Sequence, residues 1–138
     1  MASPREAAYR ATTYAAGEGA QRVAIRIGER CAPLDALLAA RGLDEWAYLT
    51  AHNPGGRLAD PAANAAAQAR LEAELAAAGH PFLRGASLGD GGDWPPETSL
   101  LVLGLPRQAA LALARRYRQE AFVTGRCGRP AELVFCEP

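Results

Sequence analysis

The chain has 138 residues, of which 49% are hydrophobic and 22% are charged, which is typical of one globular domain with a single core. Fifteen arginines balance fifteen acidic residues, and lysine does not occur. Because the formal net charge is zero, the composition does not favour nucleic acid or an anionic membrane as a partner. The absence of lysine also excludes Schiff-base catalysis and a phosphate-binding loop with its lysine.

The sequence lacks both the apolar core of a signal peptide and a run of about 18 apolar residues that could span a membrane. We therefore expect a cytoplasmic protein without membrane contact, and the richness in alanine and arginine indicates a GC-rich bacterial genome. The three cysteines, Cys31, Cys127 and Cys136, share no close spacing with one another or with histidine. We expect buried free thiols, with a Cys127–Cys136 disulfide as the alternative, and neither a metal site nor a cofactor.

The hydrophobic pattern predicts strands and helices in the order ββαβαββαββ. The strands are expected at residues 9–16, 21–27, 46–50, 81–88, 99–103, 121–124 and 133–136. The helices are expected at residues 33–41, 60–79 and 106–119. This order predicts a single α+β domain over residues 1–138, in which three helices cover a mixed sheet of about six or seven strands.

Two of these elements have specific signals. Asp60 followed by Pro61 is typical of a helix start, with an N-cap acceptor before proline at the first helical position. The apolar run at residues 99–103 fits a strand that is buried on both faces. With the helix and strand that follow, this run predicts a right-handed βαβ unit with parallel strands.

The most informative segment follows the third strand and contains Thr50, His52, Asn53 and Arg57. In this turn, Gly55-Gly56 allows several backbone N–H groups to point toward one place, and Arg57 adds a positive charge. The positive end of the helix at 60–79 is expected nearby. These groups favour a phosphate or a carboxylate as the ligand.

Asn64 lies in the apolar stripe of that helix, close to Leu71 on a helical wheel. An inward amide without partners would cost roughly 1–3 kcal/mol, so we expect it to hydrogen-bond with the 50–57 loop. In the simplest alternative, Asn64 only holds that loop in place.

The remaining candidates are weaker. A hydrolase would need His52 or His80 beside a nucleophile, but no nucleophile motif is present. Asp90 and Asp93 do not match an EF-hand. Glu97 is expected to form a structural salt bridge, or to share acid–base chemistry with Asp93.

Several segments together resemble the bacterial family known as domain of unknown function 3293, over about residues 9–137. They are Tyr9-Arg10-Ala11-Thr12, Ile25-Arg26-Ile27-Gly28, Thr50-Ala51-His52-Asn53-Pro54, the run from Trp94 to Gly104, and the Ala-Leu-Ala-Arg-Arg-Tyr helix leading to Gln119. The resemblance implies one compact domain and no assigned reaction. Thr50, Asn53, Asn64 and Glu97 fit the family pattern better than His52, whose position often carries an aromatic residue.

Two hypotheses follow, and whether the protein is an enzyme stays open. In the first, the domain binds a small anionic or nucleotide-like ligand in a polar pocket lined by Thr50, His52, Asn53, Arg57, Asn64 and Glu97. In the second, it is a protein-interaction or regulatory module in which these residues only brace a loop. Its partner would then bind at Trp94, which we otherwise expect to cover apolar surface, or at the cluster of Arg115, Arg116 and Arg118.

Overall fold

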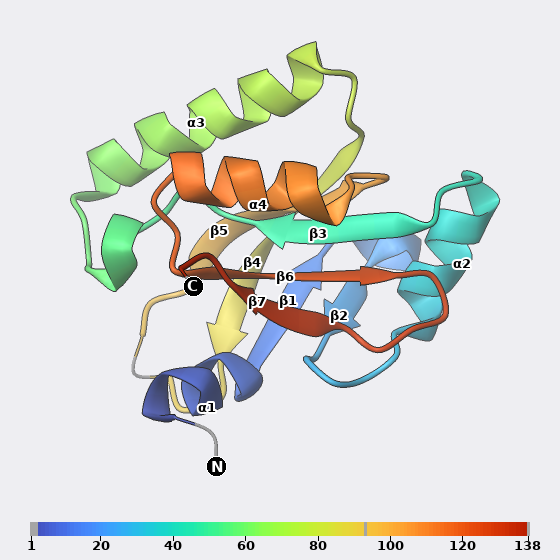
Figure 1. The fold of residues 1–138 in the computed structure, drawn as a ribbon, viewed down its shortest axis with the longest axis horizontal. Coiled ribbons are helices and arrows are strands. Elements are labelled where there is room, and N and C mark those ends of the chain that lie inside the picture. Colours follow the sequence, from blue (N-terminus) through green and yellow to red (C-terminus); the bar gives the residue numbers. More distant parts are fainter. Residues whose placement is uncertain (1–2, 93, 138) are drawn as a thin grey trace.

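The computed structural model describes residues 3–92 and 94–137. The strands are β1 (Thr12–Ala16), β2 (Val23–Ile25), β3 (Glu45–Leu49), β4 (Phe82–Gly89), β5 (Glu97–Leu103), β6 (Ala121–Arg126) and β7 (Glu132–Phe135). The helices are α1 (Pro4–Arg10), α2 (Ala32–Ala40), α3 (Pro61–Ala77) and α4 (Arg107–Arg116), and short 3₁₀ turns lie at Gly19–Gln21 and Pro54–Gly56. Figure 1 shows their arrangement.

All seven strands belong to one curled sheet in the order β2-β1-β4-β5-β3-β6-β7. Neighbouring strands pair antiparallel throughout. The two edges of the sheet approach each other just beyond β2, where Ile27 and Ala131 form an isolated parallel bridge. There the Gly28 N–H donates to the Ala131 carbonyl at 2.8 Å, and the Ala131 N–H donates to the Glu29 carbonyl at 3.0 Å. The curl therefore gives the sheet an inner and an outer face.

The predicted α+β class and the seven strands are confirmed, with two differences in arrangement. First, the only parallel pairing among the described residues is the isolated bridge, so the sheet is mixed only there. Second, β5 and β6 run in the same direction but are not neighbours, because β3 pairs antiparallel with both of them. The predicted βαβ unit with parallel strands is therefore present, but β3 lies between its two strands.

The structure has four helices among the described residues instead of three, because α1 precedes the first strand. Ser3 caps this helix by accepting a hydrogen bond from the Glu6 N–H at 3.1 Å, and Pro4 occupies its first turn. The strand predicted from residue 9 consequently begins only at Thr12. A serine followed three residues later by glutamate is the capping-box signal that could have predicted α1.

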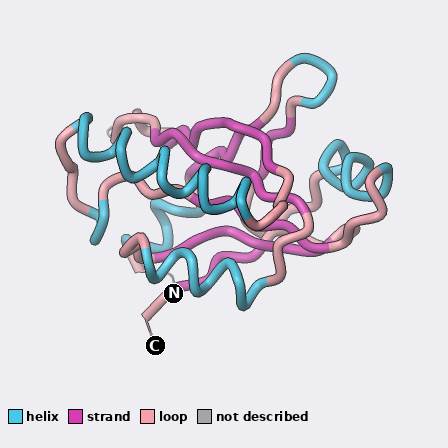
Figure 2. The backbone as a smooth tube through the Cα atoms, turned by 90° about the horizontal axis from the view of Figure 1, so that it is seen from above, coloured by secondary structure: helices cyan, strands magenta, loops and turns pink. Residues whose placement is uncertain are grey.

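Two hydrophobic layers lie on the two faces of the sheet. On the outer face, α3 and α4 lie side by side and pack on side chains such as Leu49, Leu100 and Val102 (Figures 1 and 2). On the inner face, Leu34 and Leu38 of α2 join the core. α2 lies near the start of β3 (Figure 1). Among the described residues, the helix at the other end is α1, which has no fully buried residue.

The start of α3 differs in detail from its prediction. Pro61 is the first helical residue, as expected, but the Asp60 side chain makes no capping hydrogen bond. Asn64, Ala67, Leu71 and Leu75 are buried along one side of the helix, as the predicted stripe requires.

We expect Gly85→Ala to destabilise the protein, because β1 and β4 approach closely at this position. A Cβ atom on Gly85 would lie 1.9 Å from the Ala15 carbonyl oxygen and 2.5 Å from the Ala16 Cα. Such overpacking typically lowers the free energy of unfolding by about 1–3 kcal/mol, which chemical denaturation would measure. Gly89→Ala is the control, because Gly89 lies in the same strand and a Cβ there meets no atom within 4 Å. Equal stability of the two variants would contradict this packing.

Candidate functional site

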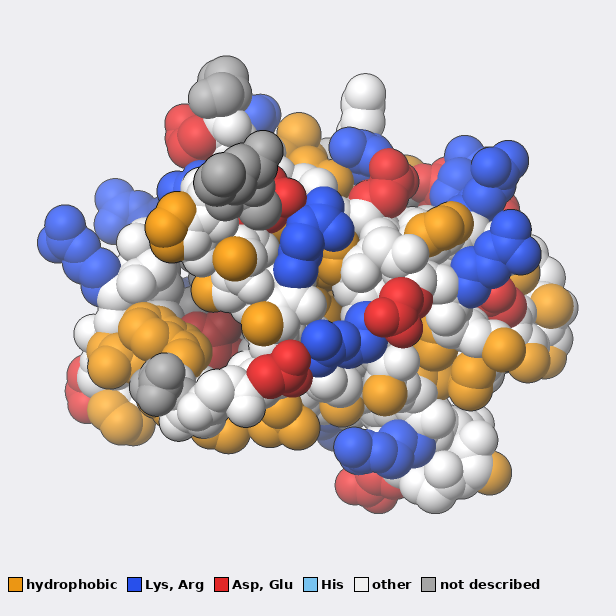
Figure 3. Space-filling model, turned by 90° about the horizontal axis from the view of Figure 1, so that it is seen from below, with side chains coloured by type: hydrophobic (Ala, Val, Ile, Leu, Met, Phe, Trp, Pro, Cys, Tyr) orange, Lys and Arg blue, Asp and Glu red, His pale blue; other side chains and the backbone are white. Residues whose placement is uncertain are grey.

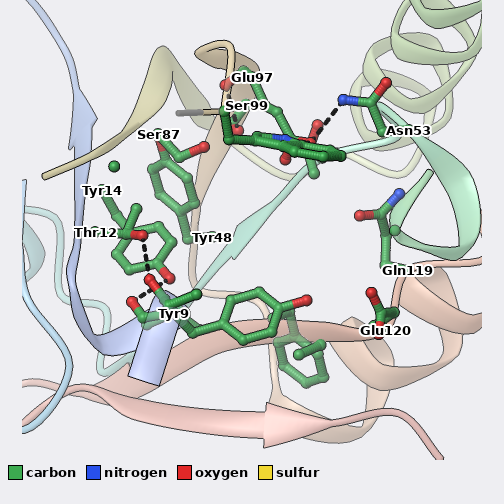
Figure 4. Close-up of a pocket in the computed structure, with 18 of the residues that line it drawn as sticks. Tyr9, Thr12, Tyr14, Tyr48, Asn53, Ser87, Glu97, Ser99, Gln119 and Glu120 are labelled. Atoms are coloured by element: carbon green, nitrogen blue, oxygen red, sulfur yellow. Dashed lines mark hydrogen bonds between the residues drawn. The ribbon is translucent and has the colours of Figure 1, made fainter. Parts of the chain in front are cut away.

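A cavity of about 470 Å³ lies on the inner face of the sheet, at the end away from α2. Its walls come from α1, β1, β3, β4, β5 and β6, together with the loops before β5 and after β3. Residues from both ends of the chain therefore meet around one space (Figure 4). The side chains that line it are aromatic or polar for the most part.

Two tyrosines form the inner part of the cavity. The rings of Tyr14 and Tyr48 meet edge to face with centroids 5.3 Å apart. The Tyr14 hydroxyl donates to the Tyr9 carbonyl at 2.8 Å, and the Tyr48 hydroxyl donates to the Ala15 carbonyl at 2.8 Å. Ser99 beside them is buried, and its hydroxyl donates to the Glu97 carbonyl at 2.9 Å. These hydrogen bonds fix both rings in place.

Asn53 determines the shape of the loop after β3. Its backbone is left-handed, with φ 51° and ψ 61°, a conformation that asparagine adopts more readily than most residues. Its side-chain Oδ1 accepts hydrogen bonds from the Ala59 N–H and from Asn64 Nδ2, both at 2.9 Å. Its Nδ2 donates to Glu97 Oε2 at 2.7 Å. Asn53 thus links the loop to α3 on one side and to β5 on the other.

Asn64 completes this link from α3. Its Oδ1 accepts a hydrogen bond from the Asn53 N–H at 2.8 Å, so the two asparagines bond in both directions. Gln68, one turn further along α3, accepts from the Ala51 N–H at 2.9 Å. The prediction that the inward amide of Asn64 holds the loop is confirmed. Asn64 does not line the cavity on the inner face.

Glu97 lies at the mouth of the cavity, held by two neutral donors. Its Oε2 accepts from Asn53 and, at 2.9 Å, from Trp94 Nε1. Among the described residues it has no ion-pair partner, so the salt bridge predicted for it is not found. Trp94 is 41% exposed and lines the cavity beside Glu97.

The opposite rim joins α1 to β6. Arg5 of α1 forms an ion pair with Glu120 at 2.8 Å, and its guanidinium lies 4.7 Å from the centre of the Phe135 ring. Gly56 packs on Glu120 so closely that a Cβ atom would lie 1.9 Å from the carboxylate oxygen. Gln119 donates from Nε2 to the His52 carbonyl at 3.0 Å. The two contacts of Arg5 hold the short helix α1 at the edge of the cavity.

The structure brings together only part of the predicted site. Thr50, Asn53 and Glu97 line the cavity, whereas Arg57 is exposed and lies outside its lining. His52 and Asn64 instead line a second cavity of about 520 Å³, which is bordered by the loop, by α3 and by Pro95, Pro96 and Thr98. Gln68 also borders this second cavity, and its buried Nε2 has no hydrogen-bond partner among the described residues. Asp93 lies outside the described residues.

Several lining residues were not predicted from the sequence. They are Arg5, Tyr9, Tyr14, Tyr48, Ser87, Gln119 and Glu120. The strand alternation does place residues 12, 14 and 16 on one face and 46, 48 and 50 on one face, but it does not tell which faces meet.

A model of the family described as "Protein of unknown function (DUF3293)" matches residues 49–122, which is more than half of the 138 residues. The chain belongs to this family. No curated protein and no solved structure matches it. The matched segment contains the Asn53–Asn64 pair and Glu97, whereas α1 lies outside it.

In this DUF3293 protein, burial raises the pKa values of the tyrosines around the cavity. Burial raises the pKa of Tyr9 to about 12, and the negative charge of Glu120 acts in the same direction. Burial also raises the pKa values of Tyr14 and Tyr48. All three phenols are therefore protonated at neutral pH and can act as hydrogen-bond donors.

The cysteines are unpaired with one another, and two of the arginines at the end of α4 make contacts within the protein. The three cysteines are free thiols, so the Cys127–Cys136 disulfide is wrong, and only Cys136 is fully buried. Arg115 donates to the Cys136 carbonyl at 3.0 Å, and Arg116 pairs with Glu74.

On the face seen in Figure 3, positively and negatively charged side chains are intermixed. No helix within the described residues is long and apolar enough to cross a membrane.

We expect Asn64→Ala to lower the free energy of unfolding by about 1–3 kcal/mol, because it removes both hydrogen bonds to Asn53 and leaves a buried N–H without a partner. Urea denaturation would measure the loss. Arg70→Ala is the control, since Arg70 is exposed on the same helix and should change stability by less than about 0.5 kcal/mol. A similar small effect for Asn64→Ala would show that the asparagine pair does not hold the loop.

The stability of the protein should depend on pH through His52. Burial lowers the pKa of His52 below its ordinary value of 6.5, although Glu97 opposes this shift. The unfolded chain therefore binds the proton more readily, and the contribution of neutral His52 is lost as the pH falls through about 6.5. We expect His52→Gln to reduce the fall in the free energy of unfolding between about pH 7 and pH 5. Parallel curves for the variant and the wild type would contradict this.

Proposed function

We propose that this DUF3293 protein binds a small molecule in the cavity on the inner face of its sheet. The observation that carries the proposal is the cavity itself, because about 470 Å³ lies within the range of small-molecule sites. Such sites combine apolar walls with a few fixed polar groups. Here Tyr9, Tyr14 and Tyr48 supply apolar surface, and Asn53, Glu97 and Gln119 supply polar groups.

The polar groups are held in position before any ligand arrives. Asn53 makes three side-chain hydrogen bonds, Glu97 accepts two, and Gln119 donates to two backbone carbonyls. A fixed arrangement lowers the entropic cost of binding. This rigidity supports a binding role for the same residues that brace the loop.

The anionic ligand that the sequence favoured has less support than the cavity. It depended on Arg57 and on free N–H groups in the loop, yet Arg57 is exposed away from the cavity. The Gly55 N–H donates to the Arg118 carbonyl at 2.8 Å, and the Gly56 N–H donates to the Asn53 carbonyl at 3.1 Å. These N–H groups are therefore occupied within the protein. The proposal keeps the small ligand and not its negative charge.

The alternative function is a protein-interaction or regulatory module. Two observations favour it. Asn53 and Asn64 use their hydrogen-bonding groups on each other, and the side chains of Leu58 (62%) and Trp94 (41%) are exposed to solvent. A module of this kind needs no cavity, whereas here an open space with apolar walls and a few polar groups lies on the other side of the same loop. The ligand-binding proposal accounts both for the Asn53–Asn64 hydrogen bonds and for the cavity.

We expect Ser87→Phe to abolish ligand binding, because the new ring would project from β4 into the cavity that Ser87 lines. A thermal-shift screen of small metabolites and amines at millimolar concentration would first identify compounds that raise the Tm of the wild-type protein. Each compound would then be tested with the variant.

Leu88→Phe is the matched control. Leu88 is the next residue of β4, is 41% exposed and does not line the cavity, so compounds should still raise its Tm. If no compound stabilises the wild-type protein, or if Ser87→Phe responds as the wild type does, the cavity is not a binding site.

A further inference from the structure

The charges around the cavity do not balance. Asp90, Glu97 and Glu120 are its carboxylates among the described residues, and Arg5 is its guanidinium. Asp90 pairs with Arg26 through two hydrogen bonds of 2.9 and 3.1 Å, and Glu120 pairs with Arg5 at 2.8 Å. Glu97 alone has no cationic partner in the part of the chain that the structure describes. One negative charge at the mouth of the cavity is thus left for a ligand to neutralise.

His52 does not supply the missing positive charge. It lies behind the loop, outside the lining of this cavity. Burial also lowers its pKa from the ordinary value of 6.5, which disfavours the charged ring.

The hydrogen-bonding groups are also unevenly used. Most side-chain donors that line the cavity already have partners within the protein: Asn53 Nδ2, Trp94 Nε1, Gln119 Nε2, and the hydroxyls of Thr12, Tyr14, Tyr48 and Ser99. In contrast, Glu97 Oε1 and Gln119 Oε1 accept no hydrogen bond from a described residue. The hydroxyls of Tyr9 and Ser87 remain, and a hydroxyl can accept as well as donate. The cavity is therefore rich in free acceptors.

Aromatic rings surround these acceptors. Tyr9, Tyr14, Tyr48 and Trp94 line the cavity. Figure 4 shows Tyr9, Tyr14 and Tyr48 across the cavity from Asn53 and Gln119. The faces of such rings attract cations and also pack against flat apolar groups. A carboxylate, free acceptors and aromatic faces together complement a cation that carries N–H donors.

From this arrangement we propose that the ligand carries a positively charged nitrogen group, of the amine or guanidinium class, on a flat apolar body, with Glu97 as its counter-ion. The inference rests on the proposed function and adds the charge and shape of the ligand. Glu97 is suited to this role because Asn53 and Trp94 hold its Oε2 and leave Oε1 open.

The test uses three probes with the same indole ring and different charge: tryptamine is cationic, tryptophol is neutral and indole-3-acetate is anionic. Calorimetric titration of the wild-type protein at pH 7 should give a Kd for tryptamine at least ten-fold lower than for tryptophol, with indole-3-acetate the weakest. Glu97→Gln keeps the shape of the side chain and removes the charge, so it should reduce the preference for tryptamine by about ten-fold. Glu29→Gln is the control, because it removes an exposed charge that does not line the cavity.

The outcomes separate the two proposals. If tryptophol or indole-3-acetate binds as tightly as tryptamine, the cationic ligand is wrong, while the cavity stands as a binding site. If none of the three binds and the metabolite screen also finds nothing, both proposals fail. The order of the three probes on the wild-type protein decides the ligand class even if Glu97→Gln does not fold.

Discussion

The two hydrogen bonds between the amides of Asn53 and Asn64 are the contact on which the rest of the site depends. They fasten the loop after β3 to the first turn of α3, and they hold Asn53 in its left-handed conformation. From that position the Asn53 side chain reaches β5 and orients Glu97, which in turn receives the Trp94 indole. An apolar residue in place of Asn64 would fit the helix stripe equally well, but it would leave this series of contacts without an anchor.

The cavity lies where the inner face changes from packed apolar side chains to tyrosines and serines. Near α2 the strands carry Trp46, Leu101 and Leu103, and these side chains fill the space beneath the curl. Toward the other end, Ser99 on β5 and Ser87 on β4 lie on the same face as Tyr14 and Tyr48. The small serine side chains leave space beside the two rings. The core and the site are thus two halves of one face.

The sequence pattern was sufficient for every strand and for all helices but α1, and it was not sufficient for their arrangement. Alternation and helix periodicity are local signals, so ten strands and helices lie close to their predicted bounds. Strand order depends on contacts between distant segments, and the apolar runs of β3 and β5 do not state which neighbour each will take. For that reason the insertion of β3 between β5 and β6 was not predicted.

The site was predictable where a polar residue stood in an apolar context. Asn64 interrupts the apolar stripe of a helix, and Glu97 begins a buried strand, so the sequence alone marks both as candidate site residues. Tyr14 and Tyr48 look like ordinary strand residues, and only the curl brings them together. Arg57 was a misleading signal because a charge next to a glycine turn resembles an anion site, although the chain directs this side chain into solvent.

The attachment of α1 separates access to the cavity from the integrity of the fold. This helix has no fully buried residue and is held mainly by the contacts of Arg5 and Tyr9 with Glu120, Phe135 and Tyr14. A protease cut near residue 11, or a bulky extension fused before Ser3, would therefore unseat one wall of the cavity and leave the fully buried residues of both hydrophobic layers in place. Preparations that differ only at the amino terminus would therefore look equally well folded and yet differ in their affinity for a ligand in the cavity.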